Sequence, residues 1–183
     1  PWDRRKVLEK ISLSYLGKEL EATVGDYYAQ LGRGLVLSLR KVDELGVDTT
    51  LFGAKVAWRK GPVSTMAFAG FTNIQNVDDT SGTYVPDPDD LVGGARVEGR
   101  LFDKVLVAVQ GAGGLPSENR SIISVERDQW ARYGASVEVP RIGRYASFYL
   151  EAARATARLN DAREQGTAIY AAATGYAGDV TLL

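Results

Sequence analysis

The stretch LVGGARVEGRLFDKVLVAVQGAGG, residues 91–114, decides the fold. From residue 91 to residue 101 every second residue is apolar or small, and the residues between them include Arg96, Glu98 and Arg100. Side chains of a strand point alternately to its two faces, so this pattern predicts a strand with one apolar and one charged face. A reversal at Asp103-Lys104 and the apolar run Val105–Gln110 complete a predicted β-hairpin.

The same alternation recurs on both sides of this hairpin. Further strands are predicted over residues 11–16, 20–24, 50–59, 63–71, 129–139, 144–157 and 166–177, and from 180 onward. Short turns at 17–18, 60–62, 102–104, 140–143 and 178–179 contrast with longer links at 72–90, 113–128 and 158–165. Short periplasmic turns at one end and long outer loops at the other are typical of outer-membrane barrels. We therefore predict an all-β, antiparallel up-and-down meander that forms a transmembrane β-barrel or part of one.

In this interpretation the apolar faces contact lipid and the charged faces line a lumen. Aromatic residues near strand ends fit interfacial girdles: Trp58, Phe71, Phe102, Trp130 and Tyr145. The predicted lumen and constriction residues are Arg33, Arg40, Lys55, Arg59, Arg96, Glu98, Arg100, Arg132, Glu138 and Arg154. An Arg-lined lumen favours anions. A second interpretation of equal weight is that these Arg residues form ion pairs with Glu98, Glu138 and Glu151 across strands and so stabilise the sheet.

Residues 25–49 interrupt the regular pattern. If the turns at 17–18 and 60–62 lie on one side of the membrane, the strand before residue 25 ends on the other side, and the strand after residue 49 begins there. The segment 25–49 therefore leaves and returns on the same side and cannot contain exactly one additional membrane-spanning strand. Its apolar residues argue against a solvated loop, so we predict that residues 31–45 fold inward and narrow or plug the lumen. Polar residues of this segment would then face Arg96, Arg100 and Arg132; they are Asp26, Arg33, Arg40, Lys41, Asp43 and Glu44. A short strand pair with a bulge at residues 32–34 is the alternative.

The composition excludes several classes of chemistry. The 183 residues carry a formal net charge of -1, so bulk charge gives no case for nucleic-acid binding. Cys and His are both absent, which removes disulfides, the usual zinc ligands and Ser-His-Asp triads. No apolar run is long enough for a transmembrane helix. The sequence starts at Pro1 and stops within a predicted strand, so we expect a single segment, residues 1–183, of a longer barrel.

Two short motifs, Val24-Gly25-Asp26-Tyr27 and Leu31-Gly32-Arg33-Gly34-Leu35, precede the alternating strands rich in Gly, Arg and aromatic residues. This order resembles uncharacterised bacterial outer-membrane β-barrel proteins. The resemblance implies a location in the outer membrane and outer-membrane lipid as the surroundings, and it implies no substrate.

Other candidate chemistry is weaker. The acidic groups Asp78-Asp79 and Asp87-Pro88-Asp89-Asp90 offer oxygen ligands for Ca²⁺ but lack the register of a calcium loop, so a solvated loop is favoured. Glycine-rich runs at 32–34 and 111–114 match no phosphate-binding motif. Glu98, Glu138 and Glu151 could supply a glycosidase pair, yet ion pairing with Arg is the stronger expectation.

We therefore expect no catalysis, cofactor or metal. The first expectation is a passive channel or solute-uptake pore in the bacterial outer membrane. The alternative is a structural or assembly barrel that binds other envelope proteins, and a weaker one is a soluble β-barrel binding module.

Overall fold

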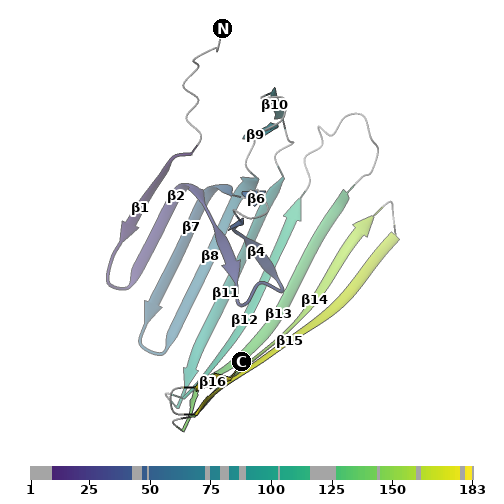
Figure 1. Ribbon diagram of the computed structural model, residues 1–183. Coiled ribbons are helices and arrows are strands. Elements are labelled where there is room, and N and C mark those ends of the chain that lie inside the picture. The colour runs from purple at the N-terminus through teal and green to yellow at the C-terminus, as the bar shows by residue number, and fades with distance from the viewer. Residues whose placement is uncertain are drawn as a thin grey trace.

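The computed structural model describes residues 10–42, 47–48, 50–72, 75–78, 83–86, 90–102, 104–115, 127–143, 145–159, 162–177 and 180–182. These residues form an antiparallel meander built around one 10-stranded sheet (Figure 1). Its strands, in spatial order, are β1 (Ser12–Leu16), β2 (Leu20–Tyr27), β7 (Leu51–Lys60), β8 (Val63–Thr72), β11 (Leu91–Leu101), β12 (Val105–Leu115), β13 (Arg127–Ile142), β14 (Ala146–Leu159), β15 (Ala162–Ala177) and β16 (Val180–Leu182). The predicted all-β up-and-down architecture is confirmed.

The sheet is open in the part of the chain that the structure describes. Its two edges are β1 and β16, and these strands are not paired with each other. The predicted up-and-down meander is therefore present, and the described residues do not close into a barrel.

The central hairpin forms as predicted, and residues 102–104 separate its two strands. Leu91 pairs with Leu115, Arg96 with Gln110 and Leu101 with Val105. The strands of the hairpin are longer than predicted on the return side, because β12 continues to Leu115. Outer neighbours β8 and β13 pair along nearly the whole length of the hairpin, so residues 91–115 lie in the interior of the sheet.

The connections are short at one end of the sheet. There β1–β2, β7–β8, β11–β12 and β13–β14 are each joined by a few residues, as predicted. At the opposite end β2 and β7 are separated by residues 28–50, and β8 and β11 by residues 73–90. We call these the turn end and the loop end.

One predicted loop is wrong. Residues 158–165 were expected to be a longer link, but Arg158 pairs with Arg163 and Thr156 with Gln165 across β14 and β15. Only residues 160–161 separate these two strands. Polar composition indicated a loop here, whereas the backbone of a polar strand end can continue the ladder of hydrogen bonds as well as an apolar one does.

Six short strands lie outside the main sheet. They form three separate pairs: β3 (Ala29–Leu31) with β4 (Leu37–Leu39), β5 (Lys41–Val42) with β6 (Val47–Asp48), and β9 (Gln75–Asp78) with β10 (Thr83–Pro86). The segment between β2 and β7 therefore contains two strand pairs, β3–β4 and β5–β6, and neither joins the sheet. The alternative prediction of a strand pair is met at β3–β4, with a turn rather than a bulge at residues 32–34.

Paired residues of neighbouring strands point to the same face, so the register divides the sheet into two faces. One face, called the apolar face, carries exposed large hydrophobic residues from every strand of the main sheet except β16: Leu13, Val24, Phe52, Val56, Trp58, Phe71, Leu91, Val97, Leu101, Val109, Leu115, Tyr133, Leu150 and Ile169. The other, called the polar face, carries Glu21, Lys55, Arg59, Arg96, Glu98, Arg100, Gln110, Arg132, Ser136, Glu138, Tyr149 and Glu151.

The exposure of the apolar face is large. Leu13 is 78% exposed, Val109 59% and Ile169 72%. Among the described residues no helix is long and apolar enough to cross a membrane.

Candidate functional site

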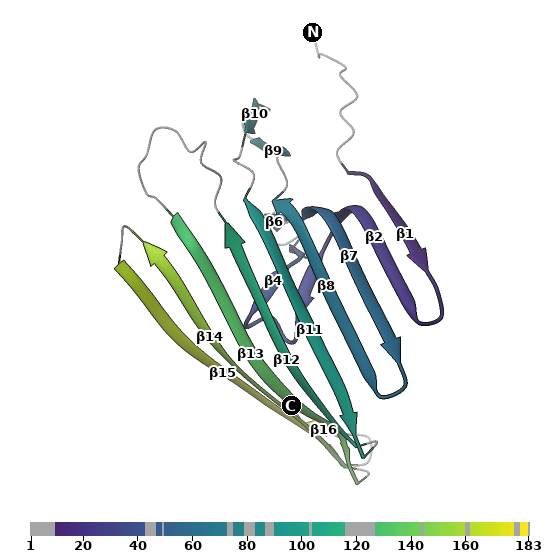
Figure 2. The same cartoon turned by 180° about the vertical axis from the view of Figure 1, so that it is seen from behind.

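The β3–β4 hairpin lies against the polar face of the sheet, in front of the sheet in Figure 1 and behind it in Figure 2. Four hairpin residues, Ala29, Leu31, Val36 and Leu37, are buried in one cluster with residues of the sheet. The sheet residues of this cluster are Tyr27, Leu51, Phe68, Val92, Ala112 and Ala153. Burial of each large apolar side chain contributes about 1.5–3 kcal/mol, so this contact holds the hairpin firmly on the loop-end half of the polar face.

The tip of the hairpin reaches the middle of the polar face. Gly32, at φ 57°, begins the turn, and the N–H of Gly34 donates to the carbonyl of Leu31 at 3.0 Å. A Cβ atom at Gly32 would lie 2.7 Å from Oε2 of Glu151 and 2.9 Å from Nε2 of Gln110. Glycine at this position therefore allows both the left-handed backbone and the close approach of the tip to the sheet.

Glu151 receives this tip. The residue is 0% exposed. Its Oε2 accepts hydrogen bonds from the backbone N–H of Arg33 at 2.8 Å and from the hydroxyl of Tyr149 at 2.7 Å. Its Oε1 accepts a hydrogen bond from Nε2 of Gln110 at 2.6 Å. A buried carboxylate needs such donors because charge is costly to remove from water, so Glu151 ties the hairpin to β12 and β14. We call Glu151 with these three donors the latch.

A second row of polar contacts lies beside the latch. Arg96 donates from Nη1 to Oε1 of Gln110 and, at 3.4 Å, to Oγ of Ser136. Its Nη2 forms an ion pair with Oε2 of Glu98 at 2.8 Å. Because Gln110 accepts from Arg96 and donates to Glu151, its amide has only one orientation that serves both partners. The network thus connects β11, β12, β13 and β14 to the hairpin tip.

The guanidinium of Arg33 stays close to the latch. It lies over the ring of Tyr149, 5.0 Å from the ring centre. Tyr149 in turn contacts Tyr170 of β15, with the ring centres 6.1 Å apart. The predicted residue Arg33 is therefore on the polar face, and its backbone N–H, rather than its charge, makes the hydrogen bond to Glu151.

The remaining predicted residues are spread along the polar face. Near the turn end, Arg59 pairs with Glu21 at 3.0 Å, while Arg100 and Glu138 flank Leu106 in the register. Near the loop end, Nζ of Lys55 donates to the carbonyl of Tyr28 at 3.1 Å.

Two predicted residues lie near the hairpin or the loop end without joining the latch. Arg132 lies over the ring of Trp130 at 5.2 Å, and Arg40 directly follows β4 and is exposed. The predicted residues described so far are spread along the polar face, and only Arg33, Arg96 and Glu98 among them belong to one connected network.

Two sequence predictions about this face are wrong. Arg154 pairs with Tyr133 and Thr167 and donates to Oε1 of Gln165, so it lies on the apolar face. Charge suggested the lumen for this residue, whereas the register assigns Tyr149, Glu151 and Ala153 of β14 to the polar face. Asp26 does not face Arg96, Arg100 or Arg132, since its Oδ2 accepts a hydrogen bond from the N–H of Ile11 at 2.8 Å.

Sequence reasoning missed Gln110 and Tyr149, and it treated Glu151 only as a partner for Arg. The available signal was the register of the central hairpin: a strand pair closed at residues 102–104 places Gln110 opposite Arg96. The approach of Arg33 to Glu151, 118 residues apart in the chain, has no local signal.

The acidic loop lies mostly outside the described residues. Residues 79 and 87–89 are not described, and of residue 78 only the backbone is. In the described part of the chain no group of three or more acidic residues is placed to hold a metal ion. Lys41, Asp43 and Glu44 have side chains outside the described residues as well.

A family model described as a family of unknown function (DUF6029) matches residues 2–79. The match includes β1, β2, the β3–β4 hairpin, β7 and β8, and it stops before the strands that carry Gln110 and Glu151. No curated protein and no solved structure matches the chain. Over residues 2–79 the chain is thus similar to a family whose function is itself unknown.

Proposed function

We propose that this chain forms the wall of a bacterial outer-membrane β-barrel, with the apolar face toward lipid and the polar face toward a lumen that the β3–β4 hairpin narrows. The barrel acts as a pore for solutes and has no catalytic step. One observation carries the proposal: large hydrophobic side chains are exposed on one face of the sheet from β1 to β15, while the opposite face is charged. Soluble proteins rarely expose a continuous apolar surface of this extent.

The dimensions of the apolar face support this proposal. On β11 the apolar and small residues run from Leu91 to Leu101, and at about 3.4 Å per residue they extend about 34 Å along the strand. With the strand tilt of about 35–45° usual in such barrels, this length corresponds to an apolar band about 25 Å tall, the height found in outer-membrane barrels.

The packing on the polar face supports the assignment of inside and outside. In a soluble barrel or sandwich the apolar face would be covered and the charged face would meet water. Here the β3–β4 hairpin packs on the polar face and forms the buried cluster with it. A charged network at membrane depth is tolerated where it is enclosed by protein or lines a water-filled cavity, and the latch and Arg96 then lie inside the barrel.

The charges of the lumen support a preference for anions. Between the latch and the turn end the polar face carries Arg59, Arg96 and Arg100 against Glu21, Glu98 and Glu138, and nearer the loop end it also carries the cations Lys55 and Arg132. Arg59 and Arg96 have carboxylate partners at 3.0 and 2.8 Å. Cation rings favour anions in pores, and paired cations contribute less, so we expect weak selectivity for anions.

Conductance in planar bilayers tests the pore. The expected result is discrete open currents, with anions more permeant than cations and with this preference reduced by Arg100→Gln. Lys104→Gln is the matched control because it removes a cation in the turn that follows β11. Inserted protein without any current would reject the pore.

One observation favours a second candidate, a structural barrel that binds envelope proteins. The hairpin is held on the polar face both by a buried apolar cluster and by the latch. A segment that only narrows a pore does not need both of these attachments. A protein that inserts into bilayers but stays silent, even when the hairpin is released by a latch variant, would support this candidate over the pore.

A further inference from the structure

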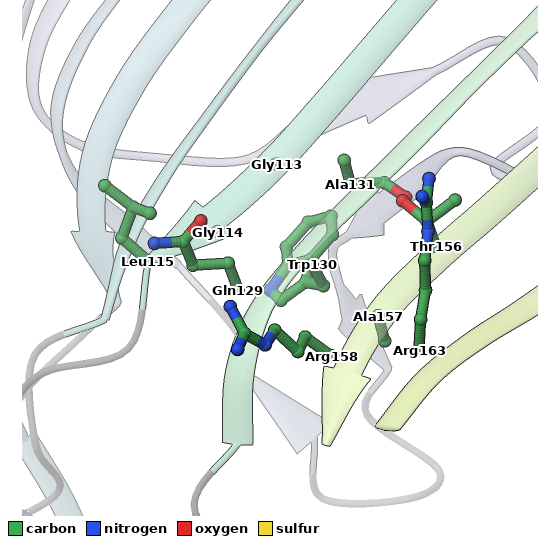
Figure 3. A pocket seen from close by; sticks show the side chains of 10 residues that line it. All are labelled: Gly113, Gly114, Leu115, Gln129, Trp130, Ala131, Thr156, Ala157, Arg158 and Arg163. Carbon is green, nitrogen blue, oxygen red and sulfur yellow. The ribbon is translucent and has the colours of Figure 1, made fainter. Parts of the chain in front are cut away.

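Pockets lie at both ends of the sheet. The one at the loop end is shown in Figure 3, with Trp130 in the middle and Arg158 and Arg163 beside it. In the register Arg158 pairs with Arg163 on the apolar face, whereas Trp130 pairs with Gly114 on the polar face. The polar groups of this pocket are therefore divided between the two faces of the sheet and do not converge on one ligand.

The pocket at the turn end has a different arrangement. Its volume is about 740 Å³, and it lies between the ends of two neighbouring hairpins, β11–β12 and β13–β14. Three aliphatic side chains of its lining, Val105, Val139 and Ile142, lie on the apolar face according to the register. A ligand with a hydrocarbon chain that binds here would therefore extend along the apolar face.

The charged residues of this lining, Lys104 and Arg141, are both cations, and both are exposed. The pairing of Leu106 with Glu138, continued by two residues, brings residue 104 opposite residue 140 and thus beside Arg141. Like charges on neighbouring strands repel each other, so an anion that lies between these two cations stabilises this end of the sheet.

Neither cation has a carboxylate partner within the described part of the chain. Two turn residues that lie outside that part, Asp103 and Arg144, add one charge of each sign. The two hairpin ends therefore keep an excess of positive charge.

The charged groups of Lys104 and Arg141 are not fixed on the polar face by regular pairing. Lys104 lies beyond the last pair of its hairpin, which joins Leu101 and Val105. Arg141 lies in the irregular stretch between the paired residues Val139 and Ile142. Long cationic side chains can lay their methylene groups along an apolar surface while the charge stays at the boundary with water.

Two exposed aromatic residues flank the pocket. Phe102 is 92% exposed and has φ 50°, a conformation that bulky residues seldom adopt, and Tyr145 is 67% exposed. Aromatic side chains concentrate at the level of the lipid headgroups in membrane proteins. If the apolar face is in lipid, these residues place the pocket at that level.

We propose that the turn-end pocket binds an anionic phospholipid, with the phosphate between Lys104 and Arg141 and an acyl chain along Val105, Val139 and Ile142. The proposal rests on the proposed function, because it needs the apolar face to be in lipid. Charge complementarity selects the lipid: cations beside a membrane surface attract anionic headgroups, and a zwitterionic headgroup offers no net charge to them.

Bromine atoms in lipid acyl chains quench a tryptophan that they contact, so a Trp beside the pocket reports which lipid lies there. Phe102→Trp supplies this reporter in a chain whose three native Trp residues are replaced by Phe. A second form keeps only Trp58, which lies on the apolar face of β7 at the same end of the sheet. Both forms are folded into phosphatidylcholine vesicles that contain an equal minor fraction of either brominated phosphatidylglycerol or brominated phosphatidylcholine.

The reporter at position 102 should be quenched preferentially by brominated phosphatidylglycerol. The expected preference is roughly tenfold or more, since each of the two cations contributes to it. The double variant K104Q/R141Q should reduce the preference to roughly twofold or less. Trp58 should be quenched to the same extent by both brominated lipids, which also shows that each variant is folded into the bilayer.

The matched control is K18Q/K60Q, which removes the same number of cations at the same end of the sheet. Neither residue lines the pocket, and Lys60 already pairs with Glu19 at 3.9 Å. The preference at position 102 should persist in this variant.

Equal quenching of the reporter at position 102 by the two lipids would overturn the proposal. So would a loss of the preference in K18Q/K60Q as large as that in K104Q/R141Q, since it would mean that net charge alone attracts the lipid. In both cases quenching of Trp58 leaves the proposed function standing. Absence of quenching of either Trp by either lipid would instead overturn the proposed function, and the lipid site with it.

Discussion

Replacement of Glu151 by Gln should release the β3–β4 hairpin from the sheet. The carboxylate accepts from the N–H of Arg33 and the hydroxyl of Tyr149 on one oxygen and from Gln110 on the other. An amide of the same shape keeps only one acceptor oxygen. In either orientation of the new amide, its NH₂ group faces a hydrogen-bond donor, either Nε2 of Gln110 or the N–H of Arg33 and the hydroxyl of Tyr149.

Rotation of the Gln110 amide does not repair this defect. After such a rotation its Nε2 would face Nη1 of Arg96, which now donates to Oε1 of Gln110. The variant therefore loses at least one buried hydrogen bond to a charged group and leaves a donor unsatisfied, at a cost of about 2 kcal/mol.

The assay uses a buried hairpin residue as a reporter. The chain has no Cys, so Val36→Cys introduces the only thiol, at a position that is fully buried in the hairpin cluster. If maleimide reacts only when the hairpin leaves the sheet, a loss of about 2 kcal/mol raises the labelling rate roughly 30-fold in E151Q.

The control is Glu98→Gln in the same Cys background. Glu98 lies on the polar face, and its contact among the described residues is the ion pair with Arg96 rather than a hydrogen bond to the hairpin. Its replacement should change the labelling rate less than about threefold. Equal rates in E151Q and in the unmodified background would refute the assignment of Glu151 as the latch.

Further predictions concern the hairpin tip, the two faces and the exposed ion pairs. Gly32→Ala should raise the labelling rate of Val36→Cys roughly tenfold or more, because the new Cβ meets Glu151 and Gln110 at a positive φ; an unchanged rate would show that the tip is not closely packed. Val97→Arg should reduce the fraction of chain that folds into lipid vesicles, at a cost of about 2–4 kcal/mol near the membrane centre; Ser64→Arg, on the polar face of the neighbouring strand, should fold like the unmodified chain, and the reverse order would contradict the assignment of faces. Glu21→Gln should lower the free energy of unfolding by less than about 1 kcal/mol, because its pair with Arg59 is exposed; a larger loss in urea titrations would mean that this pair is shielded from water.

The strands could be predicted from the sequence because the alternation of apolar and polar residues lies within each strand. Residues 91–101 show period 2 without any knowledge of their neighbours, and the structure forms a strand with those limits. The strand predicted over residues 63–71 is also present, as β8 from Val63 to Thr72, and the predicted turn before it lies at residues 61–62. The end of β14 and the start of β15 were missed because the pairing of polar residues such as Arg158 and Arg163 leaves no hydrophobic pattern.

The candidate site was predicted only in part, since its residues meet through the register of strands. Arg96 and Glu98 were recognised because their charge interrupts an apolar strand. Arg154 was misplaced because its charge alone does not say on which face of β14 it lies, and the pairing with Tyr133 decides it. The latch depends on a contact between the tip at Arg33 and Glu151 that follows from the inward folding of residues 29–39, and no spacing in the chain encodes it.

The central claim is that one face of the sheet meets lipid and the other does not. Nitroxide labels at single cysteines test it on adjacent positions of β11: Val97→Cys on the apolar face and Glu98→Cys on the polar face, with the chain folded into lipid vesicles. The label at 97 should be relaxed mainly by oxygen dissolved in lipid, and the label at 98 should be reached mainly by a water-soluble nickel complex or by neither agent. Equal access of oxygen to both labels, or greater access at 98, would contradict it.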